Sequence, residues 1–171
     1  MKRVFYVTLG LLVMTLGCQT NQKLTDQQKD LIVKAVKERS QQFFDINKSY
    51  NTESLQKTMS FSDENIDKAW LTDPAEVVFD INIIKTRADV QNFWGMAIES
   101  RISTNITMTE DHFAVLSKDQ VVEVNKADYT ITGKDSITSG PYTMVHTIVW
   151  VNINGEWKML HIHQSSAKKT E

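Results

Sequence analysis

The chain has 171 residues, with 19 Lys and Arg against 21 Asp and Glu and a formal net charge of −2. The charges form no basic stripe and no interleaving of arginine with aromatic residues. These are the marks of nucleic-acid binding, so we expect no nucleic-acid partner. One cysteine excludes a disulfide within the chain.

The first residues are typical of an export signal. Lys2 and Arg3 precede an apolar run, Val4–Leu16, which is shorter than a comfortable membrane span. The run ends just before Cys18, and residues 15–18 (Thr-Leu-Gly-Cys) resemble the lipobox of bacterial lipoproteins.

That resemblance implies removal of residues 1–17, a lipid on Cys18 and a polar tether over residues 18–24. Gln19 stands where Asp would imply retention in the inner membrane. We therefore expect a lipid-anchored protein of the bacterial cell envelope, in the outer membrane and facing the periplasm, with the anchor as its sole membrane contact. An ordinary secretory signal with an incidental cysteine is the alternative.

Four segments combine a helix-start signal with apolar residues at helical spacing. In the first, Thr25 and Gln28 are spaced as a capping box, in which each side chain bonds the other's backbone N–H. Asp73-Pro74 should end the third, because the residue before proline avoids the helical region. The predicted helices span residues 26–47, 52–59, 64–71 and 87–100.

After residue 101 the apolar period changes to two, which is typical of strands. The predicted strands span residues 103–109, 112–117, 120–132, 142–153 and 157–166, and residues 76–80 and 81–84 form short strands or one bent strand. Helices followed by a run of antiparallel strands predict the α+β class, in one domain over residues 25–166. Residues 167–171 form a polar tail.

The last two strands flank Asn154-Gly155, the strongest short-range signal for a two-residue hairpin. Ile153 should then pair with Glu156. By alternation the following pairs should share one face: Trp150 with Met159, Ile148 with His161, His146 with His163, and Met144 with Ser165. The opposite face would carry Val145, Val149, Val151, Leu160 and Ile162.

We predict a ligand pocket on the face that carries the histidines. Aromatic side chains with a few polar groups are what small-molecule pockets contain. Three histidines on a hairpin can also bind zinc, but no carboxylate stands behind them, so we predict neither a metal nor a cofactor. Purely structural histidines are the alternative. The candidate ligand-binding residues are His146, His161, His163, Tyr142, Trp150 and Ser165.

The end of the chain, GEWKMLHIHQSS from Gly155 to Ser166, resembles the G-x-W-x-(apolar)-(apolar)-x-x-H-x-S ending of SnoaL-like domains in the nuclear transport factor 2-like superfamily. The resemblance covers residues 25–166. It implies a cone, in which a strongly curved antiparallel sheet surrounds the first helix and leaves a pocket at its open end. It also implies a homodimer formed through the outer sheet face. In the ketosteroid isomerase branch a general-base Asp lies on an early strand, which makes Asp80 a candidate.

A fold of this kind does not by itself give a function. We favour a protein that binds a small, partly apolar ligand, because no nucleophile with a paired base is recognisable. One alternative is an acid–base enzyme that uses His161, His163 and Asp80 as an isomerase, a hydratase or a carbonic-anhydrase-like enzyme. The last rests on a partial match to the His-His-His-Ser-Ser ending of iota-class carbonic anhydrases. The other alternative is a homo-oligomerisation module.

Overall fold

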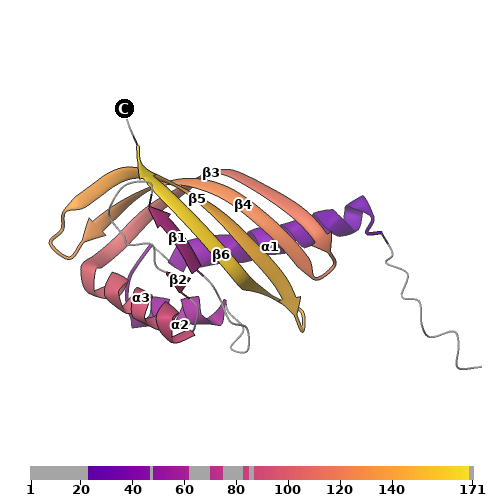
Figure 1. The fold of residues 1–171 in the computed structure, drawn as a ribbon, viewed down its shortest axis with the longest axis horizontal. Coiled ribbons are helices and arrows are strands. Elements are labelled where there is room, and N and C mark those ends of the chain that lie inside the picture. Colours follow the sequence, from indigo (N-terminus) through magenta and orange to yellow (C-terminus); the bar gives the residue numbers. More distant parts are fainter. Residues whose placement is uncertain (1–22, 47, 62–69, 75–82, 85–86, 170–171) are drawn as a thin grey trace, which may run out of the picture.

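The computed structural model describes residues 23–46, 48–61, 70–74, 83–84 and 87–169. Its long strands arch across one long helix, and two shorter helices lie together at one end of the sheet (Figure 1). The elements in chain order are α1 (Asp26–Ile46), α2 (Thr52–Ser60), β1 (Trp70–Pro74), β2 (Ile83–Ile84), α3 (Arg87–Ser100), β3 (Arg101–Ser117), β4 (Gln120–Gly133), β5 (Thr138–Ile153) and β6 (Glu156–Lys168). The predicted α+β cone is confirmed.

The strands form one sheet in the order β2-β1-β6-β5-β4-β3. The four long strands β3 to β6 are antiparallel throughout, as predicted. At one edge the short β1 joins β6 in parallel and β2 in antiparallel orientation. The two strands predicted over residues 103–117 are one continuous β3, with a register shift between Met108 and Glu110.

Local sequence signals account for the helices. The Thr25 hydroxyl accepts the backbone N–H of Gln28 at 3.2 Å, and the Gln28 amide oxygen accepts the N–H of Thr25 at 2.9 Å. Asn51 caps α2 with a second reciprocal pair to Ser54. The predicted first and second helices are thereby confirmed, and the fourth is confirmed by α3, which spans the predicted residues.

The helix predicted over residues 64–71 is wrong at its end. Trp70 and Leu71 lie in β1, opposite Ile162 and His163 of β6. Pairing with a distant strand outweighs the local helix signal, because a ladder satisfies the same backbone groups and also adds to the sheet. Residues 64–69 and the predicted strand 76–80, which includes Asp80, lie outside the described residues, as does Cys18; Ile83–Ile84 forms β2, within the second predicted segment.

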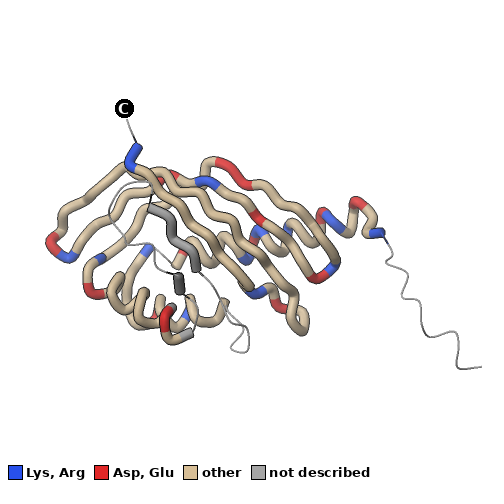
Figure 2. Tube along the Cα trace, viewed as in Figure 1, with Lys and Arg blue, Asp and Glu red and all other residues tan. Residues whose placement is uncertain are grey.

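The core lies between α1, the other two helices and the concave face of the sheet. Trp150 and Ile148 of β5 are fully buried there, and Val36 of α1 is buried with them. None of the helices in the described part of the chain has the length and hydropathy needed to cross a membrane. Charged residues of both signs are interspersed along the described helices and strand ends (Figure 2).

Candidate functional site

A β-bulge in β6 decides which histidines reach the interior. The hairpin follows the predicted register from Ile153–Glu156 to Trp150–Met159, but the next pair is Val149 with His161. One extra residue, Leu160, is therefore inserted in β6. After the bulge, each side chain of β6 therefore points to the sheet face opposite to the one that simple alternation predicts.

The predicted histidine face is consequently wrong beyond the bulge. His146 lies opposite Gln164 instead of His163, Ile148 lies opposite Ile162, and Met144 lies opposite Ser166. Ile162, predicted on the face opposite the histidines, is therefore buried in the core at 2% exposure. His161 and His163 do share a face, but it is the outer one, which also carries Val149 and Val145. Ser165 points to that outer face as well, because it pairs with Val145, which is 39% exposed.

The remaining predicted pocket residues take different positions. Trp150 is a core residue whose indole N–H donates to Glu123 at 2.7 Å. Tyr142 packs against Tyr129 of the neighbouring strand, with 5.2 Å between ring centroids, and Tyr129 lines the cavity described next. Of the six predicted residues, His146 is the one that lines this cavity.

The cavity, of about 80 Å³, lies between α1, α3 and the concave side of the sheet. Its walls are mainly aromatic and aliphatic. They come from two helices and from the strands: Phe43 and Phe44 of α1, Phe93, Trp94 and Ala97 of α3, and Ile106, Ile131, Met144 and Ile162 of the strands. Typical drug-sized pockets are several times larger, so the volume favours a small ligand.

Isolated polar groups are set into these apolar walls. The hydroxyls of Tyr50 and Thr104 share a hydrogen bond of 2.9 Å, and the Tyr129 hydroxyl is hydrogen-bonded to Ser166. Burial raises the pKa of Tyr129, so this phenol is neutral. Among the described lining residues, Arg101 is the one with a permanent charge, and its guanidinium lies 5.8 Å from the centre of the Tyr50 ring.

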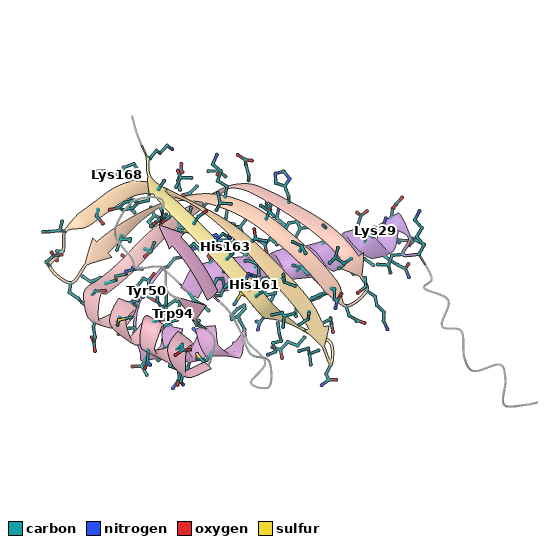
Figure 3. All side chains as sticks on the ribbon, in the orientation of Figure 1. Lys29, Tyr50, Trp94, His161, His163 and Lys168 are labelled. Carbon is teal, nitrogen blue, oxygen red and sulfur yellow. The ribbon has the colours of Figure 1, made fainter. Side chains whose placement is uncertain are left out.

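Trp94 contributes a hydrogen-bond donor that the described residues leave unused. The side chain is 3% exposed and stacks on Tyr50 with 5.4 Å between ring centroids (Figure 3). Its indole N–H is buried and has no hydrogen-bond partner among the described residues. Such a donor costs about 1–3 kcal/mol when it is left unsatisfied.

His146 reaches the cavity at the end of a buried polar chain. Its Nδ1 lies 2.9 Å from Oδ1 of Asn125, and its Nε2 lies 3.1 Å from Oε1 of Gln164. Burial lowers the pKa of His146 to about 4, because a charged imidazolium would lose its hydration, so the ring is neutral at pH 7.

This buried polar chain, which is the row of hydrogen-bonded side chains Gln164, His146, Asn125 and Glu123, ends at Glu123, which is 1% exposed. Its carboxylate accepts hydrogen bonds from Ser40 of α1 at 2.7 Å, from Asn125 at 2.6 Å and from Trp150 at 2.7 Å. Burial raises the pKa of Glu123, and these three donors act in the opposite direction. Sequence reasoning missed Glu123 and Asn125, although β4 carries them at the same parity as the inward Val121 and Ala127.

Ser40 and Glu123 also line a second, more polar cavity of about 280 Å³. Lys37 and Asp111 form an ion pair of 2.6 Å at its wall. The buried polar chain therefore runs between two cavities on either side of Phe44, which lines both. In the described part of the chain, no cluster of three His, Cys, Asp or Glu side chains could hold a metal ion.

Solved structures of low sequence identity share this fold. A putative calcium/calmodulin-dependent protein kinase II association domain from Xanthomonas campestris matches with a TM-score of 0.59 and 16% identity, covering 81% of this chain and 87% of its own. A putative dehydratase of the NTF2-like family from Streptomyces avermitilis matches with a TM-score of 0.65 and 14% identity, covering 82% and 99%. A hexachlorocyclohexane dehydrochlorinase from Novosphingobium barchaimii matches with a TM-score of 0.63 and 14% identity, covering 85% and 93%.

The family is established by sequence. The model of the SnoaL-like domain matches residues 36–169, and the chain belongs to that family. The search among curated proteins finds no significant match. The predicted resemblance to SnoaL-like and nuclear transport factor 2-like domains is confirmed, while the structural neighbours, at these identities, show the fold alone.

Proposed function

We propose that this SnoaL-like domain binds a small, partly apolar molecule in the cavity between α1, α3 and the concave face of the sheet. The observation that carries the proposal is an aromatic cavity with isolated polar groups in its walls; one of its lining residues, Trp94, has a buried indole N–H without a partner among the described residues. Apolar walls supply the affinity of such sites and a few placed polar groups fix the orientation of the ligand.

Acid–base catalysis has less support. A general base and a second ionisable group must converge on one substrate atom. His161 and His163 lie on the outer face, and both ring nitrogens of His146 are already within hydrogen-bond distance of protein side chains. A protein described as a putative dehydratase and a hexachlorocyclohexane dehydrochlorinase share the fold, but those descriptions belong to those proteins.

The proposal extends to location and assembly. The export-signal pattern of residues 1–17 supports a lipid on Cys18 and a place in the bacterial cell envelope. For assembly, the outer face of β4 and β5 exposes Val124 and Val145, each 39% accessible. Together with the fold shared with an association domain, this apolar strip supports a homodimer through the outer sheet face.

A thermal-shift screen of small amphipathic metabolites tests the binding proposal. Ala97 lines the cavity and is 5% exposed, so Ala97→Leu should fill the cavity and abolish the stabilisation by a genuine ligand. Met96→Leu, at the exposed neighbouring position of α3, and His163→Ala, on the outer face, are the matched controls and should leave it unchanged. A ligand whose stabilisation survives Ala97→Leu but is lost in His163→Ala would contradict the proposed site.

A further inference from the structure

The buried polar chain has a fixed direction, which begins at Glu123. A carboxylate can only accept hydrogen bonds, and the indole N–H of Trp150 can only donate. The Asn125 amide must therefore present its NH₂ group to Glu123, at 2.6 Å. This leaves the amide oxygen of Asn125 facing His146, at 2.9 Å from Nδ1.

The orientation of the Asn125 amide fixes which nitrogen of His146 carries the ring proton. An amide oxygen is an acceptor, so Nδ1 of His146 must carry the ring proton, and a neutral ring then has a bare lone pair on Nε2. That lone pair requires a donor. The Gln164 atom at 3.1 Å is Oε1, which can only accept, so the Gln164 amide must be turned end for end to donate. The oxygen and nitrogen ends of an amide are nearly alike in size, so Gln164 can direct its NH₂ group at His146 within the same packing. Its oxygen is then the end available to the cavity that Gln164 lines.

We propose that Glu123, which does not itself line the ligand cavity, sets the hydrogen-bonding polarity of that cavity by fixing His146 as the Nδ1–H tautomer and thereby turning the Gln164 oxygen toward the ligand. Glu123 is a positioning residue that acts through Asn125 and His146. The statement about ligands rests on the proposed function, whereas the statement about the tautomer does not.

The row of hydrogen bonds from Glu123 through Asn125 and His146 to Gln164, which we call the relay, specifies the chemical class of ligand. Two cavity-lining residues would then have groups of fixed polarity: the oxygen of Gln164, an acceptor, and the indole N–H of Trp94, a buried donor without a partner among the described residues. The matching ligand has a small apolar body, a hydroxyl or N–H group directed at Gln164 and an acceptor atom directed at Trp94. A purely acceptor-bearing molecule of the same size would leave Gln164 unsatisfied, since two acceptors cannot share a hydrogen bond.

The ring nitrogen shifts of His146 in the ligand-free protein test the relay directly. Full-length protein with ¹⁵N-labelled histidine, assigned by comparison with His146→Gln, should show protonated Nδ1 and bare Nε2. In Glu123→Gln, the new amide keeps its oxygen for Trp150 and directs its NH₂ group at Asn125. Every later bond then reverses, and His146 should change to the Nε2–H tautomer.

A rescue variant distinguishes the relay from a merely structural effect. In Glu123→Gln with Asn125→Asp, the carboxylate at position 125 can only accept, so the Nδ1–H tautomer should return. Wild-type protein with Nε2–H, or with both nitrogens protonated, would overturn the relay, as would an unchanged tautomer in Glu123→Gln. If Glu123→Gln fails to fold, the wild type and the double variant still test the relay, because Nε2–H in either protein would overturn it.

Pyrrole and furan, rings of equal size that offer a donor and an acceptor respectively, test the ligand class by NMR titration. The ratio of the furan Kd to the pyrrole Kd should fall about fivefold or more in Glu123→Gln, as expected for one exchanged hydrogen bond, and should recover in the double variant. An unchanged ratio in a variant whose tautomer has switched would overturn the specificity claim. If neither probe binds while the tautomer switches, the relay stands and the result counts against the proposed function.

Discussion

The neutral, buried His146 predicts a specific loss of stability in acid. In the unfolded chain this imidazole has its ordinary pKa of 6.5, whereas burial lowers the pKa in the folded protein to about 4. Between these two values the unfolded state binds one proton more than the folded state, so the free energy of unfolding falls as the pH falls. At 1.36 kcal/mol for each pKa unit, complete protonation costs about 3 kcal/mol, and most of this is lost by pH 4.5.

Urea denaturation at pH 7, 6, 5 and 4.5 measures this loss against a matched pair of variants. His146→Gln removes the titrating group, so its stability should fall by about 2.5 kcal/mol less than that of wild type over this range. His161→Gln removes an outer-face histidine and should follow the wild type.

Glu123 faces His146 through Asn125 and contributes with the opposite sign. Its pKa is raised in the folded protein, so its protonation favours the folded state as the pH falls toward its unfolded value. Because wild type and His146→Gln both contain Glu123, their difference isolates the histidine to first order. Identical pH profiles for the two proteins would refute a neutral, desolvated His146.

Three further predictions concern other parts of the molecule. Light scattering at micromolar concentration should show a dimer that becomes a monomer in Val145→Lys but not in Ile137→Lys, at the exposed β4–β5 turn; a wild-type monomer would contradict the proposed interface. Mass spectrometry of the native protein should find an acylated Cys18 at the N-terminus, and Cys18→Ser should lose membrane association but keep the wild-type unfolding midpoint. Gly155→Ala should cost about 1 kcal/mol in urea denaturation, because φ is +88° there and a Cβ would meet no neighbour, so the effect is purely conformational.

Most helices and long strands could be predicted from the sequence because their signals are local, whereas the cone itself was implied by the family resemblance. Capping pairs at Thr25 and Asn51 start two helices, and Asn154-Gly155 closes the last hairpin, as the structure confirms. Each of these features is decided within a few residues, which is the range over which spacing and propensity act. The edge strand β1 was missed because its partner lies about 90 residues further along the chain.

The site was harder to predict because it depends on one residue of register. The bulge at Leu160 has no glycine or proline to announce it, yet it places Gln164 instead of His163 beside His146. Alternation was a sound guide on each side of the bulge, so Trp150 with Met159 was predicted correctly and every later pair was shifted. A second signal was present but overlooked. Glu123 and Asn125 are polar residues at the alternating positions of β4 that point inward, where the other residues are apolar.

Those two residues also explain why the cavity can hold a neutral histidine in a defined orientation. A buried carboxylate is destabilising unless donors surround it, and Ser40, Asn125 and Trp150 each supply one from a different place in the fold. Because α1, β4 and β5 must all be packed before the three donors converge, the network favours one arrangement of the core over its alternatives. The same convergence leaves Asn125 no freedom to turn. An imidazole in water can exchange its tautomers, whereas the proposed relay holds His146 through a carboxylate two hydrogen bonds away. In that proposal Glu123 influences ligand recognition without touching the ligand.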